Sequence, residues 1–255
     1  MIRDIKTPAD YARDFRKIKQ SNVDLIDINI AYLSSYTSEI LEPYMCVELA
    51  QYNFMAKHYF APFNQFEQEV FDKNSLLYKH NPDIIIIHNM LEDMHPNLAV
   101  RFSKYSQPEL CKIARNMVSR YESILKAVRE NSNSIIICIN FSAINFQTNE
   151  LVHSSTMHKK NNYIHELNTK ILSLCSTISS CYLLDYTSII SQVGLSNWID
   201  QKLYLMAKIP FSQHGQIALG RSIARMIHSV KNQPSKCLIF DLDNTIWSGV
   251  IGEDG

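Results

Sequence analysis

The sequence predicts an α/β protein, a three-layer α/β/α sandwich built on a mostly parallel sheet. Short runs rich in β-branched residues alternate with longer stretches whose apolar residues recur at helical spacing, as in strands joined by crossover helices. The run Asp83–His88 contains consecutive isoleucines, and a continuous apolar strand is typical of a parallel sheet covered on both faces. Of the 255 residues, 46% are hydrophobic and 20% are charged, so we expect a folded globular protein.

The expected strands are short and spread along the chain. They are Leu25–Leu33, Phe54–Tyr59, Asp83–His88, Ser134–Asn140, Cys181–Leu184 and Cys237–Phe240. Before the first strand, Pro8–Lys19 has a helical pattern and is expected at the periphery. Longer helices are expected at Glu109–Glu130, His165–Ser176 and Gln216–Val230. In Glu109–Glu130 the apolar residues follow three-to-four spacing and form one stripe.

Two further stretches need interpretation. Asn145–Asn162 is polar and irregular, which favours a loop across the strand ends, although a helix beginning near Ser154 is the alternative. Phe63, Phe66 and Phe71 occur near helical spacing, so we expect them to pack in the core rather than to line a groove.

A domain boundary is expected after the helix Gln216–Val230. The polar stretch Lys231–Ser235 includes Pro234, which stops a helix, and a new strand begins at Lys236. The sequence therefore predicts an α/β domain over residues 1–230, a linker over 231–235 and the start of a second domain over 236–255.

Charge and cysteine usage exclude several classes of protein. Lys and Arg together number 25, as do Asp and Glu, so no basic field indicates a nucleic-acid partner. The six cysteines form no CxxC pair, which favours a reduced intracellular protein over a disulfide scaffold or a zinc site. The charged N-terminus lacks the apolar region of a signal peptide, and the longest apolar runs are strand-sized. We expect a cytoplasmic protein with no membrane partner.

The most specific motif is Asp241-Leu-Asp-Asn-Thr245, which directly follows the apolar strand Cys237–Phe240. Parallel sheets bind their ligands at the carboxyl edge, where this motif would lie. Asp241 could attack phosphorus and form an aspartyl-phosphate, and Asp243 could protonate the leaving group and then activate water. Two close carboxylates repel each other, so we expect Mg²⁺, which prefers oxygen ligands, to bridge Asp241 and Asp243 to the phosphate.

The segment from Asp241 to Gly255, with Trp247, Gly249 and Glu253, closely resembles the opening of the FkbH-like family. This family is a subfamily IIIC-type branch of the haloacid dehalogenase (HAD) superfamily. The resemblance implies that Asp241 is the nucleophile and Asp243 the acid/base, both near Mg²⁺. It also implies a role in polyketide and related pathways, where some members take a glyceryl unit from bisphosphoglycerate, a phosphorylated small-molecule donor, and load it onto an acyl carrier protein.

A HAD domain needs further residues after this motif, namely a Ser or Thr, a Lys and additional carboxylates. The 255-residue sequence ends at Gly255, and twenty residues cannot bury a core of their own. We therefore expect residues 236–255 to be the first strand of a truncated HAD domain, and the 255-residue chain to lack phosphatase activity.

Upstream, the segments Ile30–Thr37 and Tyr59–Met94 resemble, in the same order, the SGNH hydrolases, which implies a flavodoxin- or SGNH-like α/β domain. That resemblance implies a nucleophile after the first strand at Ser35, an oxyanion donor at Asn89 and a base at His214. The chain departs from the pattern at two places. Leu33-Ser34-Ser35 replaces the usual Gly-Asp-Ser, and Phe211 replaces the Asp three residues before the His.

Alternatives therefore remain for the upstream domain. It could be an esterase or acyltransferase that uses Ser35 and His214, or a non-catalytic module that recognises the carrier protein. Ser34, Ser35 and Thr37 could equally cap the next helix, and His214 could be an ordinary helix-start residue. A polar cluster of His88, Glu92, Asp93 and His95 follows a strand and could suggest a metal site. Its spacing does not match the helix-borne HExxH pattern, and we interpret it as ordinary residues of a surface loop.

Overall fold

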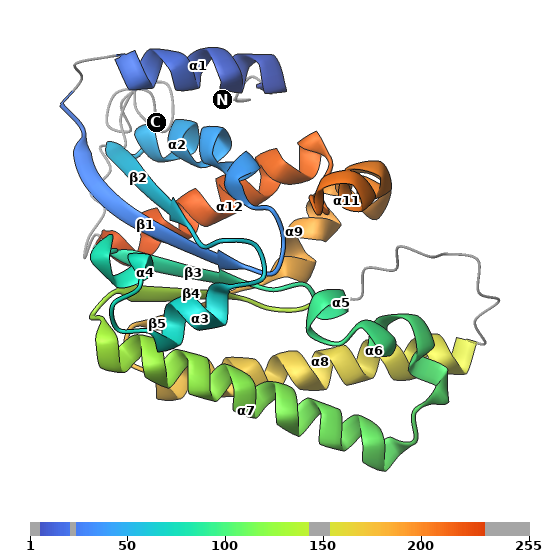
Figure 1. The fold of residues 1–255 in the computed structure, drawn as a ribbon. Helices are drawn as coiled ribbons and strands as arrows, with labels where there is room; N and C mark the ends of the chain where they lie inside the picture. Colours follow the sequence, from blue (N-terminus) through green and yellow to red (C-terminus); the bar gives the residue numbers. More distant parts are fainter. Residues whose placement is uncertain (1–5, 21–23, 143–153, 233–255) are drawn as a thin grey trace, which may run out of the picture.

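The computed structural model describes residues 6–20, 24–142 and 154–232. At its centre lies a five-stranded sheet in the order β2-β1-β3-β4-β5, with every neighbouring pair of strands parallel. Helices cover both faces of the sheet (Figure 1), so the predicted three-layer sandwich is confirmed. The strands are β1 (Ile26–Ser34), β2 (Phe54–Phe60), β3 (Ile84–His88), β4 (Ile135–Ile139) and β5 (Cys181–Leu184).

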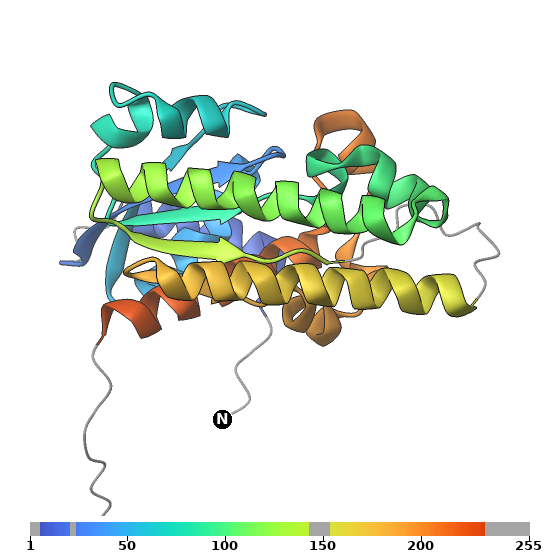
Figure 2. The same cartoon turned by 90° about the horizontal axis from the view of Figure 1, so that it is seen from below.

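The helices divide between the two faces. On one face α7 and α8 run side by side along the sheet (Figure 2), while α2 and α12 pack together on the other face and α1 lies on α2 (Figure 1). The helices are α1 (Pro8–Gln20), η1 (Glu39–Leu41), α2 (Glu42–Ala50), α3 (Phe66–Phe71), α4 (Leu76–Lys79), α5 (Leu91–Met94), α6 (Pro96–Arg101), η2 (Phe102–Lys104), α7 (Gln107–Asn131), α8 (Ser154–Thr177), α9 (Tyr186–Val193), α10 (Leu195–Trp198), α11 (Gln201–Ala207) and α12 (Gln213–Lys231).

The isoleucines of β3 explain why a parallel sheet forms. Ile85 and Ile87 belong to the apolar cluster under α7 and α8, whereas Ile84 and Ile86 belong to the cluster under α2 and α12. All are fully buried, because alternate side chains point to opposite faces and helices cover both.

Two local predictions are wrong. The segment from Ser154 to Asn162 is the first part of α8 rather than a loop, so the alternative of a helix beginning near Ser154 is correct. Phe66 is buried, but Phe63 and Phe71 are about half exposed, at 49% and 53%. The helix α3 has only 6 residues, which is too short for a three-phenylalanine stripe to face the core.

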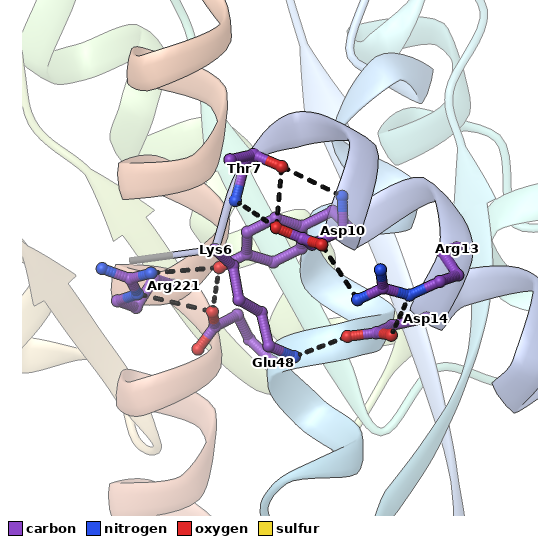
Figure 3. A network of polar contacts seen from close by, with 8 residues as sticks. Lys6, Thr7, Asp10, Arg13, Asp14, Glu48 and Arg221 are labelled. Carbon is purple, nitrogen blue, oxygen red and sulfur yellow. Dashed lines mark hydrogen bonds and ion pairs between the residues drawn. The ribbon is translucent and has the colours of Figure 1, made fainter. Parts of the chain in front are cut away.

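A buried polar group fastens α1 to the body of the protein (Figure 3). The Tyr11 hydroxyl donates a hydrogen bond to Glu48 on α2, whose side chain is almost fully buried. Arg221 on α12 donates to the Tyr11 hydroxyl over 3.1 Å and lies 3.4 Å from the Glu48 carboxylate. A buried carboxylate is tolerated only when it is paired in this way, so α1 is a docked element rather than a loose appendage.

Within the described residues, no helix combines the length and apolar character required to cross a membrane. The predicted strand Cys237–Phe240, most of the linker 231–235 and the predicted HAD segment 236–255 lie outside the described residues.

Candidate functional site at the carboxyl edge of the sheet

The candidate site lies where β1 and β3 end. The strand order is that of flavodoxin-like sheets, in which connections leave β1 and β3 on opposite sides and open a crevice between their carboxyl ends. In the register of these strands Ser34 is paired with His88, so Ser35 and Asn89 follow at the same edge. The fold thus brings two of the predicted SGNH-type residues, Ser35 and Asn89, to one place.

The Ser35 hydroxyl is held by two hydrogen bonds. It donates to the Asp93 carboxylate over 2.8 Å, and it accepts from the backbone N–H of Met90 over 2.9 Å. Tyr204 on α11 donates to the other oxygen of the same carboxylate over 3.2 Å. Through these two hydrogen bonds, Asp93 of α5 links the end of β1 to α11. The Ser35 side of this contact is buried, since Ser35 is only 3% exposed.

The neighbouring Ser34 has a local role. Its hydroxyl donates to the backbone carbonyl of Tyr36 over 2.8 Å and lies 3.0 Å from the hydroxyl of Ser38. Thr37 donates to the carbonyl of Ala207 over 2.7 Å, which ties the end of β1 to α11. These hydroxyls stabilise the turn after β1 and do not cap the next helix by side-chain hydrogen bonds.

Two carboxyl groups, those of Glu92 and Asp93, lie in α5 directly after β3. Burial raises the pKa of Asp93, although its hydrogen bonds from Ser35 and Tyr204 act in the opposite direction. Burial also raises the pKa of Glu92 to about 7, and Glu92 Oε2 has no hydrogen-bond partner among the described residues. A carboxyl group with a pKa near neutrality has the property required of a general acid or base.

The predicted oxyanion donor, Asn89, is buried with 1% exposure. Its amide nitrogen donates to the Tyr121 hydroxyl on α7 over 3.2 Å, while its Oδ1 has no partner among the described residues. The described contact therefore directs the Asn89 amide toward the helix layer.

The predicted base, His214, is in the first turn of α12 with an exposed side chain. Both His214 and Ser35 are described, and no hydrogen bond joins them. Phe211, which stands where SGNH hydrolases have an Asp, is completely buried and stacks on His88 with ring centroids 6.0 Å apart. The residue three positions before His214 is therefore a buried aromatic ring rather than a carboxylate.

His88 is the buried imidazole of this edge. Its Nδ1 lies 2.7 Å from the Tyr36 hydroxyl and 3.3 Å from the Tyr32 hydroxyl, and burial lowers its pKa to about 3. The surface interpretation of His88 is wrong, because the ring lies among aromatic side chains in the core. A neutral imidazole is favoured there because charging it would require desolvating a cation.

Sequence reasoning missed Asp93, Glu92 and Tyr204 as site residues. The spacing of Glu92 and Asp93 matched no metal motif, and nothing in the sequence linked either residue to Ser35. The one available signal was position, since residues directly after a parallel strand lie at the edge where ligands bind. Asp241 and Asp243, the predicted nucleophile, acid/base and Mg²⁺ ligands, lie outside the described residues.

A cavity of about 600 Å³ lies elsewhere in the described residues. It is lined by Asn29, Asp83, Arg129 and Ser134 among others, which places it at the amino ends of the strands. It is therefore at the opposite end of the sheet from Ser35.

Solved structures with a similar fold include the N-terminal part of a Bacteroides fragilis protein that contains a phosphatase domain, complexed with Mg. The similarity has a TM-score of 0.73 at 22% identity, and covers 96% of this chain and 63% of that one. A lipase/acylhydrolase from Enterococcus faecalis has a TM-score of 0.49 at 13% identity, covering 82% of this chain and 100% of that one. An acetyl xylan esterase has a TM-score of 0.49 at 11% identity, with 78% and 100% covered.

No curated protein sequence matches the chain. The family model of the FkbH N-terminal domain, however, matches residues 45–219, which is more than half of the 255 residues. This region extends from α2 into α12 and includes Asn89, Asp93, Tyr204 and His214, whereas Ser35 precedes it. The chain therefore belongs to the FkbH family, with residues 45–219 matching the N-terminal domain of that family.

Proposed function

We propose that this chain forms the substrate-positioning part of a FkbH-like, HAD-type enzyme. The enzyme would release phosphate from a phosphorylated three-carbon donor and load the acyl group onto an acyl carrier protein. Family membership supports this proposal, as does the shared fold with the N-terminal part of a protein that contains a phosphatase domain. The motif from Asp241 to Thr245 adds the residues that the chemistry requires.

In this proposal each aspartate has a distinct task. Asp241 accepts the phosphoryl group through a carboxylate oxygen, and Asp243 gives a proton to the leaving oxygen and takes one from the attacking water. Carboxylate oxygens are also the ligands that Mg²⁺ prefers, and the ion would supply positive charge to the phosphate.

The described domain, in this proposal, binds and orients the carrier-bound group and does not hydrolyse it. The observation that carries this assignment is the state of the Ser35 hydroxyl, which is engaged by Asp93 and Met90 and has no hydrogen bond to an imidazole among the described residues. A Ser–His pair without an orienting carboxylate also loses orders of magnitude in rate, and Phe211 occupies that carboxylate's position.

A second candidate function is acyl transfer through Ser35 with Asp93 as the base. It is favoured by the 2.8 Å hydrogen bond between these side chains and by the burial that raises the pKa of Asp93. A carboxylate of raised pKa at this distance could take the proton as the hydroxyl attacks an acyl carbonyl.

The test uses the protein with its complete phosphatase domain, a bisphosphoglycerate donor and an acyl carrier protein. Phosphate release is measured together with carrier loading by intact mass. Asp241→Asn should abolish both, because an amide cannot accept the phosphoryl group. Asp243→Asn should slow both by about a hundredfold or more, because a general acid/base is lost.

The same assay separates the roles of the upstream domain. Ser35→Ala and His214→Ala should leave phosphate release unchanged and alter loading only through the affinity for the carrier. The exposed residues Ser119 and His165 provide the matched controls Ser119→Ala and His165→Ala. If Ser35→Ala and Asp93→Asn each stop loading while carrier binding persists, the second candidate is correct. If Asp241→Asn leaves phosphate release intact, the HAD-type assignment is wrong.

A further inference from the structure

Three cysteines from β4, α8 and β5 meet beside the sheet, and Cys138 is 37 positions from Cys175 in the sequence. Cys138 lies in β4, Cys175 near the end of α8 and Cys181 at the start of β5, and their sulfur atoms all lie within 4.8 Å of one another. The sequence contains no CxxC pair, so spacing along the chain could not reveal this cluster. It forms because α8 packs along the sheet and turns directly into β5, whose Cys181 is paired in register with Ile136 of β4.

The separation of the three sulfur atoms suits one metal ion at their centre. Metal–thiolate bonds of about 2.3 Å in a trigonal plane place the sulfur atoms about 4 Å apart. The three cysteines are free thiols, and the described distances require only a small contraction to reach this arrangement.

The surroundings select the class of ion. The cluster offers sulfur alone, and no imidazole or carboxylate among the described residues joins it. Cys138 and Cys175 belong to the apolar core cluster under α7 and α8, and Cys181 packs against that cluster. Mg²⁺ and Ca²⁺ require oxygen ligands, whereas soft ions prefer thiolates, and Zn²⁺ normally needs a fourth ligand.

A second observation concerns charge. A complex of three thiolates is anionic, and burying it requires a cation nearby. The Arg129 guanidinium, at the end of α7, interacts electrostatically with Cys181. It donates to the backbone carbonyls of Ser132 and Ser134, over 3.1 and 2.9 Å, while its buried Nε has no partner among the described residues.

We propose that Cys138, Cys175 and Cys181 form a three-thiolate site for one monovalent copper ion. Binding replaces the three thiol protons by three copper–sulfur bonds, so three protons leave for solvent and no electron is transferred. Cys138 and Cys175 are buried, and the partly exposed Cys181 provides the side from which the ion enters. The site is independent of the proposed phosphatase chemistry, because its three ligands come from β4, α8 and β5 and none comes from residues 236–255.

The experiment uses the full chain, reduced and handled without oxygen, in a background that removes the other thiols by Cys46→Ala, Cys111→Ser and Cys237→Ser. Cu(I) is supplied from a chromophoric chelator, and bound copper is counted per chain. We expect one copper per chain, with an increase in melting temperature on binding. Replacing one ligand by Cys181→Ser should weaken binding by about a hundredfold or more, since even the loss of supporting residues costs up to that factor.

The background chain is the control, since it already carries Cys111→Ser at an exposed position outside the cluster and should still bind one copper. Circular dichroism of the metal-free Cys181→Ser chain establishes that it folds. The proposal is overturned if copper binding is absent, if it is equal in Cys181→Ser, or if Zn²⁺ binds at one equivalent where Cu(I) does not. A mass lower by two hydrogens in the reduced chain would identify a disulfide instead and would also overturn it.

Discussion

The Ser35 hydroxyl donates a hydrogen bond to the Asp93 carboxylate over 2.8 Å, although 58 positions separate them in the chain. This bond links the end of the central strand β1 to α5, and Tyr204 adds α11 through the same carboxylate. The residue predicted as a nucleophile is therefore also a structural connection at the β1/β3 crevice, and its two roles need separate measurements.

Replacing Ser35 should reduce stability even if it does not affect catalysis. Ser35→Ala leaves the buried N–H of Met90 without its acceptor and removes one donor from Asp93. We expect the free energy of unfolding to fall by about 1–3 kcal/mol, measured by urea denaturation. The exposed-site control Ser119→Ala should change it by no more than about 0.5 kcal/mol. Equal effects of the two substitutions would show that the described hydrogen bonds contribute nothing.

The pKa of Glu92 predicts a dependence of stability on pH. Burial raises this pKa from 4.5 to about 7, so the folded state binds more protons than the unfolded state between these values. Stability contributed by protonated Glu92 is therefore present at low pH and is lost as pH rises through about 7.

Glu92→Gln removes the charge and should make the protein more stable than the native chain at about pH 8, by about 1–3 kcal/mol, with little difference at about pH 5. Urea denaturation at both pH values measures this. Glu166→Gln, at an exposed position of α8, is the control and should show no such pH-dependent gain. A Glu92→Gln chain that is less stable at the higher pH would contradict the assignment.

The contact between Arg221 and Glu48 predicts a cost for breaking a buried pair. Arg221→Met leaves the Glu48 carboxylate with Tyr11 as its remaining partner. Because the Arg221 side chain is 36% exposed, water screens part of the interaction, and we expect a loss of about 1–3 kcal/mol. Arg225→Met, at an exposed position one turn along α12, should have little effect in the same denaturation experiment. Equal effects of the two changes would refute this role.

The close approach of α12 to α2 at Gly220 predicts that alanine is not tolerated there. A Cβ at this position would lie 2.9 Å from the Cβ of Tyr44, so the helices would have to separate. Overpacking of this kind costs about 1–3 kcal/mol, against about 1 kcal/mol gained from helix propensity. Thermal melting should therefore show Gly220→Ala below the native chain, and Ser222→Ala on the same helix close to it. A higher melting temperature for Gly220→Ala would mean that the interface can adjust.

The sequence predicts those features of the fold that depend on local patterns of apolar residues, and it misses those that depend on contacts between distant segments. The parallel sheet and its long helices were predictable from local patterns. A strand buried on both faces is a continuous apolar run, such as the isoleucines of β3, and a helix on the sheet has apolar residues at helical spacing. The start of α8 was not predictable, because polar residues near Asn162 obscure a helix that is stabilised by tertiary packing. The exposure of Phe63 and Phe71 was missed for a different reason. Helical spacing of apolar residues does not reveal how short a helix is, and α3 has only 6 residues.

The same distinction applies to the candidate site, part of which was predicted from the sequence and part of which was not. The sequence alone determined the family motif at Asp241 and Asp243 and the placement of Ser35 and Asn89 at one sheet edge, since parallel strands end together. Only the tertiary structure decided that Ser35 contacts Asp93 rather than His214, and that Cys138, Cys175 and Cys181 converge. Those contacts depend on how helices and loops pack between distant segments, and side-chain packing across such distances leaves no periodic signal in the chain.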